Sequence, residues 1–413
     1  MRILFVNTVA SGGSVPTLIG HIASAALARG DVVAVGYGRG EPCSVAGVIN
    51  IRIGSFASLA GELLASRLFD CHGLASAAST RRFIREAERF APDIVHLHNI
   101  HGYYLHYPTL FAWLRRSGIP VVWTLHDCWA FTGHCAHPDW SGCSKWSSPD
   151  GCSGCRGLGC YPKSVMADSS VKNYALKRRL FTSLSQLSIV AVGQWIADAI
   201  SRSFLADIPC SLIPNGVDVA AFTSASATET DGQLPVIAGI AGVWNHEKGI
   251  DEFVKLRRMI PSDRARIVLA GMGLRQSKLM LKGIETLPWL CGAEALGRFY
   301  GAASVYVSPT YGECNNLTKM EALASGVPVV TYRAGGSAEG LEGEDIASTV
   351  ECGDVDALVS AVERMLARMT SGEGTSLRER CRRHAAEHYN AGRMVSDTLA
   401  LYDSKVGCRE NGR

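Results

Sequence analysis

The strongest constraint on the fold is a regular alternation of short apolar, β-branched runs with longer stretches in which apolar residues recur at helical spacing. One series of predicted strands comprises Ile3–Val6, Asp31–Val35, Val48–Ile53, Asp93–His98, Val121–Leu125, Ser188–Val192 and Ser211–Pro214. A second series comprises Val236–Ile240, Arg266–Ala270, Ser304–Ser308, Pro328–Thr331 and Ser348–Val350. Continuous apolar strands joined by helices are typical of parallel sheets covered on both faces. The sequence therefore predicts two Rossmann-like, doubly wound α/β domains that face a central cleft.

Length and charge narrow the class of protein further. At about 150 residues per domain, 413 residues correspond to two domains and possibly a small third one. The 41 lysines and arginines exceed the 38 aspartates and glutamates by only 3, whereas nucleic-acid-binding proteins usually carry a strong basic excess. No stretch reaches the roughly 18–20 apolar residues of a membrane-spanning helix, and the apolar run within Met1–Asn7 is too short for a signal-peptide core. We therefore expect a cytoplasmic protein that binds no nucleic acid.

The loops after the strands are the first place to look for a functional site, because ligands of open α/β sheets bind beyond the carboxyl ends of the strands. After the first strand, Gly12 and Gly13 precede a helix and can turn backbone N–H groups toward a phosphate or sugar oxygen. Tight turns use the same residues, so this pattern alone decides little.

The segment after the predicted strand Ser304–Ser308 is more informative. It carries Glu313 in a loop, Asn315 or Asn316 as a helix N-cap, and Glu321 about one turn into the helix. A helix N-terminus offers free N–H groups and a positive dipole to an anion. Two carboxylates beside such a helix end suit a ligand that carries both hydroxyls and phosphates.

These residues belong to a set of motifs that resembles a known family. Glu313 and Glu321, followed by Ala-Leu-Ala-x-Gly-x-Pro-Val-Val, are similar to the signature of the retaining GT-B glycosyltransferases of family 4. Four further stretches match that family in order: Val122–Asp127, Ile213–Asp218, Glu247–Gly249 and Gly335–Glu339. Thr124–Cys135 is most similar to the colanic-acid and exopolysaccharide transferases. The resemblance implies a GT-B fold with an acceptor-side domain at 1–212, a Cys-rich insertion at 128–163, a nucleotide-sugar domain at 213–390, and a tail at 391–413 that crosses back.

The resemblance also assigns an activity and roles. It implies transfer of a hexose from a UDP- or GDP-sugar, with retention, to a lipid-linked saccharide in exopolysaccharide or lipopolysaccharide assembly, without a metal cofactor for catalysis. His126 and Glu313 become the expected catalytic residues. The expected donor-binding residues are Gly13, Lys248, Asn316, Leu317, Thr318 and Glu321.

The chain departs from the family pattern at one important place. Many relatives carry an arginine five residues before the lysine of the Lys-Gly turn, where this chain has Val243. Arg275 and Arg333 are the candidates for the second cation that would contact the diphosphate. Two alternatives stay open: a GT-B epimerase that acts on a nucleotide sugar without an acceptor, and a catalytically inactive partner in a polysaccharide assembly complex.

Two other features call for an interpretation. Cys135, Cys143, Cys152 and Cys155 lie in a glycine-rich segment with one C-x-x-C pair, which suits a closed tetrahedral zinc site or a set of free thiols. The basic clusters Arg81–Arg85 and Lys177–Arg179 are typical of solvated helix faces, and here they suit peripheral contact with an anionic membrane that holds the acceptor.

Overall fold

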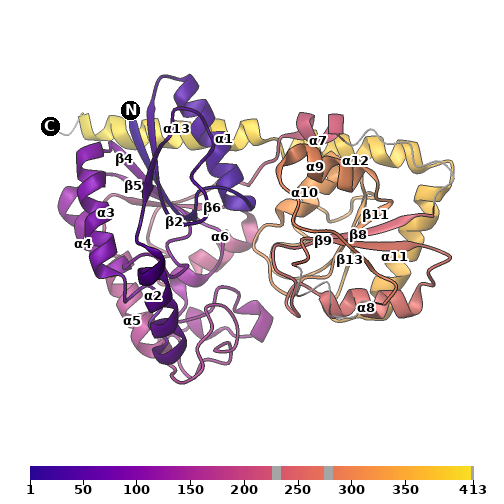
Figure 1. Ribbon diagram of the computed structural model, residues 1–413, viewed down its shortest axis with the longest axis horizontal. Helices are drawn as coiled ribbons and strands as arrows, with labels where there is room; N and C mark the ends of the chain where they lie inside the picture. The colour runs from indigo at the N-terminus through magenta and orange to yellow at the C-terminus, as the bar shows by residue number, and fades with distance from the viewer. Residues whose placement is uncertain (226–233, 274–281, 411–413) are drawn as a thin grey trace. The chain divides into compact units, whose positions relative to one another are not determined.

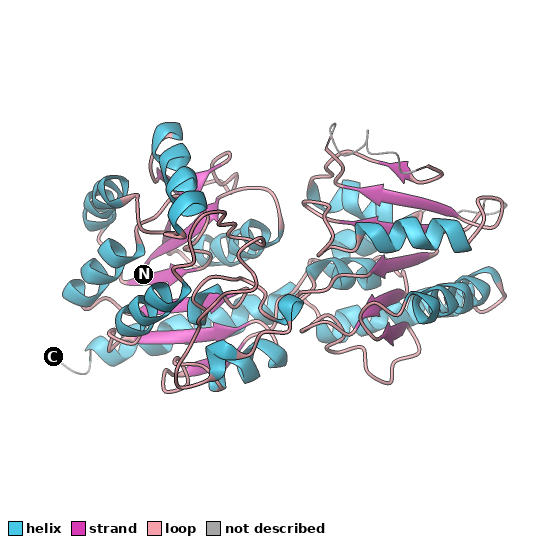
Figure 2. Cartoon of the chain, turned by 90° about the horizontal axis from the view of Figure 1, so that it is seen from below, coloured by secondary structure: helices cyan, strands magenta, loops and turns pink. Residues whose placement is uncertain are grey.

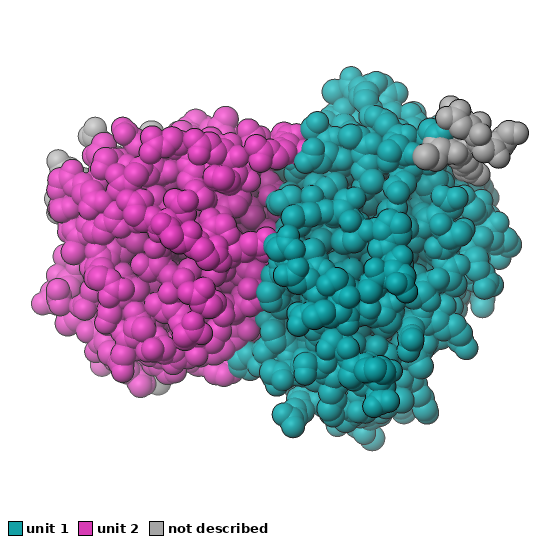
Figure 3. Space-filling model, turned by 180° about the vertical axis from the view of Figure 1, so that it is seen from behind, with its two compact units in different colours: residues 1–214, 394–413 teal, residues 215–393 magenta. Residues whose placement is uncertain are grey.

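The computed structural model describes residues 1–225, 234–273 and 282–410 (Figure 1). The chain divides into two compact units, which Figure 3 colours teal and magenta. Unit 1 contains Met1–Pro214 and Met394–Arg413, and unit 2 contains Asn215–Arg393. In each unit, the strands form one parallel sheet with helices on both faces (Figure 2).

Among the described residues, the sheet of unit 1 has the order β3-β2-β1-β4-β5-β6-β7. Its strands are β1 (Arg2–Val9), β2 (Val32–Arg39), β3 (Ile49–Arg52), β4 (Ile94–Leu97), β5 (Val121–Leu125), β6 (Leu187–Ala191) and β7 (Cys210–Leu212). Its helices are α1 (Ser14–Ala28), α2 (Phe56–Phe69), α3 (Ala77–Phe90), α4 (Tyr107–Ser117), α5 (Ser170–Phe181), α6 (Gln194–Ser201) and, from Met394 onward, α13 (Ala391–Glu410). Short 3-10 helices at Trp129–Phe131, Asp139–Ser141 and Lys145–Ser147 lie between β5 and α5.

The described part of unit 2 has a second sheet in the order β10-β9-β8-β11-β12-β13. The strands are β8 (Val236–Ile240), β9 (Arg266–Ala270), β10 (Glu285–Thr286), β11 (Val305–Ser308), β12 (Val329–Tyr332) and β13 (Ala347–Val350). The helices are α7 (Val219–Ala225), α8 (Ile250–Met259), α9 (Gly292–Gly301), α10 (Leu317–Ala324), α11 (Val355–Thr370) and α12 (Gly374–His388). Every predicted strand overlaps an observed one, which confirms the prediction of two parallel α/β sheets; β10, with two residues, was too short to be predicted.

Burial explains why the apolar runs become central strands. In β1, the side chains of Ile3, Leu4, Phe5 and Val6 have no exposed surface, because helices cover both faces of the sheet at this central strand (Figure 2). Burial of each such side chain contributes roughly 1.5–3 kcal/mol. Helix α1 ends at Ala28, and Gly30 is suited to the position just after a helix, which often needs a positive φ. Gly30 has a φ of 90°, and its N–H donates to the Leu27 carbonyl at 2.9 Å.

The passage of the chain into unit 2 explains the Ile213–Asp218 motif. The N–H of Val217 donates to the Tyr389 carbonyl at 2.8 Å, and the N–H of Ala391 donates to the Val217 carbonyl at 3.0 Å. A Cβ on Gly216 would lie 2.6 Å from the Cα of Ala391. Glycine is therefore required where the entering and leaving segments pass each other.

Beyond this crossing, the last helix packs in unit 1. Tyr402 of α13 is fully buried and its hydroxyl hydrogen-bonds Nδ1 of His96 in β4. Asp403 pairs with Arg29 at 2.9 Å. In the described residues, no helix combines the length and the apolar character needed to cross a membrane.

The prediction that the basic cluster Lys177–Arg179 lies on a solvated helix face is wrong for one of its residues. Arg178 and Arg179 are exposed, but Lys177 is buried, and its Nζ donates to the carbonyls of Trp129 at 2.7 Å and Thr132 at 3.0 Å. Burial lowers the pKa of Lys177 to about 7. This lysine fastens the start of the Cys-rich insertion and is not available to a lipid headgroup.

Candidate active site

In unit 2, the loop after β11 and the turn before α8 form one hydrogen-bonded structure. The N–H of Tyr311 donates to the Glu247 carbonyl at 2.9 Å. Gly249 has a φ of 72°, and a Cβ there would lie 2.3 Å from the Pro309 carbonyl oxygen. The Lys-Gly turn and the loop that carries Glu313 therefore hold each other in place.

Lys248 and Glu313 form an ion pair at this junction. Nζ of Lys248 lies 3.1 Å from Oε2 of Glu313 and 3.4 Å from the Gly312 carbonyl oxygen. The two side chains are 31% and 23% exposed, so a ligand can reach both. Burial alone lowers the pKa of Lys248, but the nearby carboxylates of Glu313 and Glu247 outweigh it and raise that pKa. The ammonium group therefore keeps its charge.

The helix that follows begins where the sequence left two choices. Asn316 is the N-cap: its Oδ1 accepts from the N–H of Lys319 at 3.3 Å, and its Nδ2 donates to the Ser308 hydroxyl at 2.9 Å. Leu317 and Thr318 supply N–H groups in the first turn, where helices have no internal acceptors. These donors and the helix dipole add positive character beside Glu313.

Glu321 lies one turn further along α10. The hydroxyl of Tyr300 in α9 donates to its Oε2 at 2.9 Å. Burial raises the pKa of Glu321 to about 7, although the bond from Tyr300 acts in the opposite direction. The structure thus gathers all the predicted donor-binding residues of unit 2 on one loop, one turn and one helix.

Lys319 was missed by the sequence analysis. Its buried Nζ donates to the carbonyls of Ser337 at 2.9 Å and Gly336 at 3.3 Å, which fixes the Gly-Gly loop onto α10. The N–H of Gly336 in turn donates to the Glu313 carbonyl at 2.8 Å. Burial lowers the pKa of Lys319 to about 8. The available signal was a lone cation among the apolar residues of a short helix.

Neither position 243 nor Arg333 supplies a free second cation for the diphosphate. Position 243 is 65% exposed, but it holds a valine and therefore offers no cation. Arg333 follows β12, but its Nε lies 3.1 Å from Glu351 and its Nη2 donates to the Thr349 hydroxyl at 3.1 Å. Arg275 lies outside the described residues.

In unit 1, the carboxyl ends of β4 and β5 bring histidines together. Nδ1 of His98 lies 2.9 Å from Nε2 of His126, and the two rings stack with centroids 5.2 Å apart. Burial lowers the pKa of His126 to about 4, although Asp127 acts in the opposite direction. Burial also lowers the pKa of His98. Both imidazoles are therefore neutral near pH 7.

Asp127 is part of a second contact chain that the sequence analysis missed. Its Oδ2 lies 2.8 Å from Nε2 of His101, whose Nδ1 lies 2.9 Å from the hydroxyl of Tyr161. Burial would raise the pKa of Asp127, but His101 outweighs it and holds that pKa below its usual value. Tyr161 comes from the Cys-rich insertion, so the insertion contacts this edge of the sheet directly.

Gly13 lies at the same edge of unit 1, because it follows β1, the neighbour of β4 in the parallel sheet. It is exposed and has a φ of 84° at the N-cap position of α1. A Cβ there would meet nothing within 4 Å. The backbone conformation, and not lack of space, favours glycine at this position.

Of the six cysteines within 128–163, four were predicted to bind zinc, and two of those four are in direct contact. Cys135 hydrogen-bonds Cys155, which raises the pKa of Cys135 and lowers that of Cys155 to about 6. The N–H of Gly133 donates to the sulfur of Cys152 at 3.1 Å. Among residues 1–225, 234–273 and 282–410, however, no three His, Cys, Asp or Glu side chains are grouped so that they could hold a metal ion. The zinc site stays a prediction.

Two family models together match most of the chain. Residues 22–221 match Glycosyltransferase Family 4, and residues 235–368 match Glycosyl transferases group 1. The colanic acid biosynthesis glycosyl transferase WcaC of Escherichia coli (strain K12) is 26% identical over 326 residues, which are 76% of each chain. The lipopolysaccharide core biosynthesis mannosyltransferase LpcC of Rhizobium leguminosarum bv. viciae is 28% identical over 265 residues, covering 55% of this chain and 71% of that protein.

Solved structures show the same fold at low sequence identity. A sucrose-phosphate synthase from Thermosynechococcus elongatus superposes with a TM-score of 0.70 at 17% identity, over 98% of this chain and 99% of that one. Anabaena HepE in complex with UDP-glucose gives a TM-score of 0.66 at 14% identity, over 97% and 100%. Two parallel α/β units, the family motifs in order and these matches lead to one conclusion: the chain belongs to the family 4 glycosyltransferases with the GT-B fold.

Proposed function

We propose that this glycosyltransferase moves a hexose from a UDP- or GDP-sugar to a lipid-linked saccharide, with retention at the anomeric carbon. The observation that carries the proposal is the partly exposed Lys248–Glu313 pair beside the N-terminus of α10. A cation, a carboxylate and free backbone donors at one point match a ligand that carries a diphosphate next to a sugar.

In this proposal, different residues of unit 2 bind the diphosphate, the sugar and the ribose of the donor. Negative charge grows on the leaving diphosphate in the transition state, and Lys248 with the N–H groups of Leu317 and Thr318 stabilises it. Glu313 then accepts hydrogen bonds from hydroxyls of the transferred sugar. Glu321 accepts hydrogen bonds from the ribose diol.

In unit 1, His126 supplies a neutral imidazole to the sugar or to the developing oxocarbenium region. A neutral ring can donate from one nitrogen and accept at the other without adding positive charge next to a cationic transition state. Gly13 offers its backbone to the donor. The names of WcaC and LpcC, which refer to colanic acid and lipopolysaccharide core, support a role in the assembly of a bacterial surface polysaccharide.

An exposed apolar surface on unit 1 supports peripheral contact with the membrane that holds such acceptors. Phe69 is 60% exposed, Val165 61% and Met166 75%. Two bonds tie these segments together: Val165 N–H to the Arg67 carbonyl at 2.8 Å, and the Ser169 hydroxyl to the Phe69 carbonyl at 3.1 Å. Exposed Lys163 and Lys172 flank them, as expected of a surface that meets anionic lipid.

The test is a panel of UDP-, GDP- and ADP-sugars, with the shift in melting temperature measured for each. We expect one hexose donor to stabilise the protein, and Lys248→Ala to remove that stabilisation. With that donor and lipid-linked saccharides from a bacterial membrane extract, NMR of the product should show the donor's anomeric configuration. An epimerised donor without an acceptor would instead establish the epimerase, and no stabilisation by any donor would support the inactive partner.

A further inference from the structure

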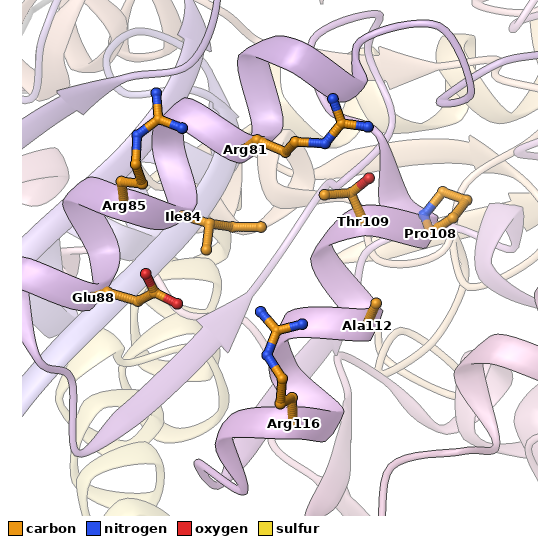
Figure 4. Close-up of a pocket in the computed structure, with 8 residues that line it drawn as sticks. All are labelled: Arg81, Ile84, Arg85, Glu88, Pro108, Thr109, Ala112 and Arg116. Atoms are coloured by element: carbon orange, nitrogen blue, oxygen red, sulfur yellow. The ribbon is translucent and has the colours of Figure 1, made fainter.

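α3 and α4 of unit 1 enclose a groove with a strongly cationic upper half. This half has a volume of about 490 Å³ and is bordered by Arg81 and Arg85 of α3 and Arg116 of α4 (Figure 4). The small side chain of Ala112 leaves the space open, and Ile84 lies between the two helices.

Among the described residues, the three arginines form no ion pairs with carboxylates of the protein. Within the described ranges, no ion pair involves Arg81, Arg85 or Arg116, whereas Arg89 on the same helix pairs with Glu86. Glu88 is the one carboxylate that lines the upper half. Three guanidinium groups against one carboxylate favour a ligand with at least two negative charges, such as a diphosphate.

The lower half of the groove has a different character. It has a volume of about 260 Å³ and shares Glu88 and Arg116 with the upper half, so the two halves adjoin. Its other lining residues are mostly apolar: Ala91, Pro92, Trp113, Ser117 and Ile119. A groove that is cationic at one end and apolar at the other matches an amphiphile with an anionic head and a hydrocarbon chain.

The orientation of the groove follows from the fold. Helices of a parallel α/β unit run opposite to the strands, so α3 and α4 begin at the carboxyl edge of the sheet. There the N–H of His106 donates to the Thr80 hydroxyl at 2.8 Å, which joins the two helix starts. The end of the cationic half that holds Arg81 and Thr109 thus lies toward the edge that carries His126, whereas Arg116 lies near the end of α4. The apolar half ends at Pro92 and Ile119, just before β4 and β5 begin.

We infer that this groove binds the lipid diphosphate of the acceptor, with the arginines on the phosphates, the hydrocarbon along the apolar half, and the saccharide directed to the edge with His126. The inference rests on the proposed function, because it names where a lipid-linked acceptor is held. It adds a binding site to unit 1 that does not involve the donor residues of unit 2.

The test uses the full chain, farnesyl diphosphate as the probe, and titration calorimetry. The groove variant is Arg85→Gln with Arg116→Gln. The matched control is Arg82→Gln with Arg115→Gln, which removes one exposed arginine from each of the same helices outside the groove. At about fivefold per arginine, we expect the groove variant to bind at least about tenfold more weakly and the control to stay within about twofold. Ala112→Trp, which fills the groove without changing charge, should weaken binding as well.

Three results would overturn the inference. The first is equal binding by the groove variant and the control. The second is binding of inorganic pyrophosphate as tight as that of farnesyl diphosphate, which would indicate a bare anion site. The third is that phosphatidylglycerol vesicles compete as well as the prenyl diphosphate, which would indicate a headgroup-binding surface. Donor-induced thermal stabilisation, measured on the same variants, distinguishes failure of this inference from failure of the proposed function. If no donor stabilises the wild-type protein, the proposed function is rejected. If the donor still stabilises the groove variant and that variant binds the lipid as the wild type does, only the groove is rejected.

Discussion

The carboxyl edges of the two sheets are built alike but carry charge differently. In unit 1, burial lowers the pKa of His126 to about 4 and leaves a neutral ring. In unit 2, burial raises the pKa of Glu321 to about 7 and favours the neutral acid. Lys248 keeps its charge because Glu313 lies 3.1 Å away, and Asp127 keeps its charge because His101 lies 2.8 Å away.

The comparison shows how one kind of sheet edge can serve two chemistries. Burial drives every titratable group toward its neutral form, and only a close partner of opposite charge or a strong hydrogen bond prevents this. Unit 2 places its accessible ion pair at a helix N-terminus and so suits a diphosphate. Unit 1 has the neutral, partly exposed imidazole of His126 at its edge, where Asp127 lies against His101, and so suits sugar hydroxyls.

The largest expected effect concerns the ion pair that distinguishes unit 2. Lys248→Ala and Glu313→Ala should each lower sugar transfer by at least about a hundredfold, the scale for loss of a preorganised charge contact. The melting temperature should change little, because both side chains are partly exposed. Arg264→Ala, which removes another exposed ion pair of unit 2, is the control and should retain activity. Full turnover by either site variant would show that the donor residues are assigned wrongly.

A second prediction concerns the insertion that sets unit 1 apart. Protein purified without chelator should contain about one zinc per chain, and Cys152→Ser with Cys155→Ser should lose it. That variant should also melt at a lower temperature and be less active, because Tyr161 of the insertion contacts His101. Cys210→Ser, an exposed cysteine of the same unit, is the control. Fully active protein with well below one equivalent of zinc would reject the metal site and leave free thiols.

The pKa of Glu321 predicts a pH dependence of donor binding. Between pH 6 and 8 the carboxyl changes from mostly protonated to mostly ionised, and the ionised form is the better acceptor for a ribose diol. Donor affinity should therefore rise by up to about tenfold over this range. A nucleotide sugar is the proper probe, since its diphosphate is ionised throughout. Glu321→Gln should give a flat profile, and an unchanged slope in this variant would assign the titration to another group.

The smallest expected effect is that the stabilities of the two units change with pH in opposite directions. The pKa of His126 falls from 6.5 to about 4 on folding, so its contribution to the stability of unit 1 rises with pH between those values. The pKa of Glu321 rises from 4.5 to about 7, so its contribution to unit 2 falls with pH across that window. Amide hydrogen exchange, corrected for the intrinsic rate, should show β5 several-fold less protected at pH 5 than at pH 7. His126→Gln should reduce this difference; the same difference in the variant would contradict the assignment.

Much of the candidate site was predictable because its residues are local in sequence. Glu313, Asn316 and Glu321 lie within one strand–loop–helix segment, and a capping signal and helical spacing place them without knowledge of the rest of the chain. Lys319 escaped notice because its partners, the carbonyls of Ser337 and Gly336, come from a later loop. Lys177 was placed wrongly at the surface for the same reason: the carbonyls that hold it come from the insertion.

The sequence by itself determined the two parallel sheets, since apolar strands with helical connections have no other way to bury both faces. It also determined which loops lie at the carboxyl edges. Only the tertiary structure decided that Asp127, His101 and Tyr161 form one chain of contacts, and that three arginines of α3 and α4 border one groove without ion pairs among the described residues. Local patterns fix the period and direction of an element, whereas partners distant in sequence, and with them the pKa of a buried group, are set by how the elements pack.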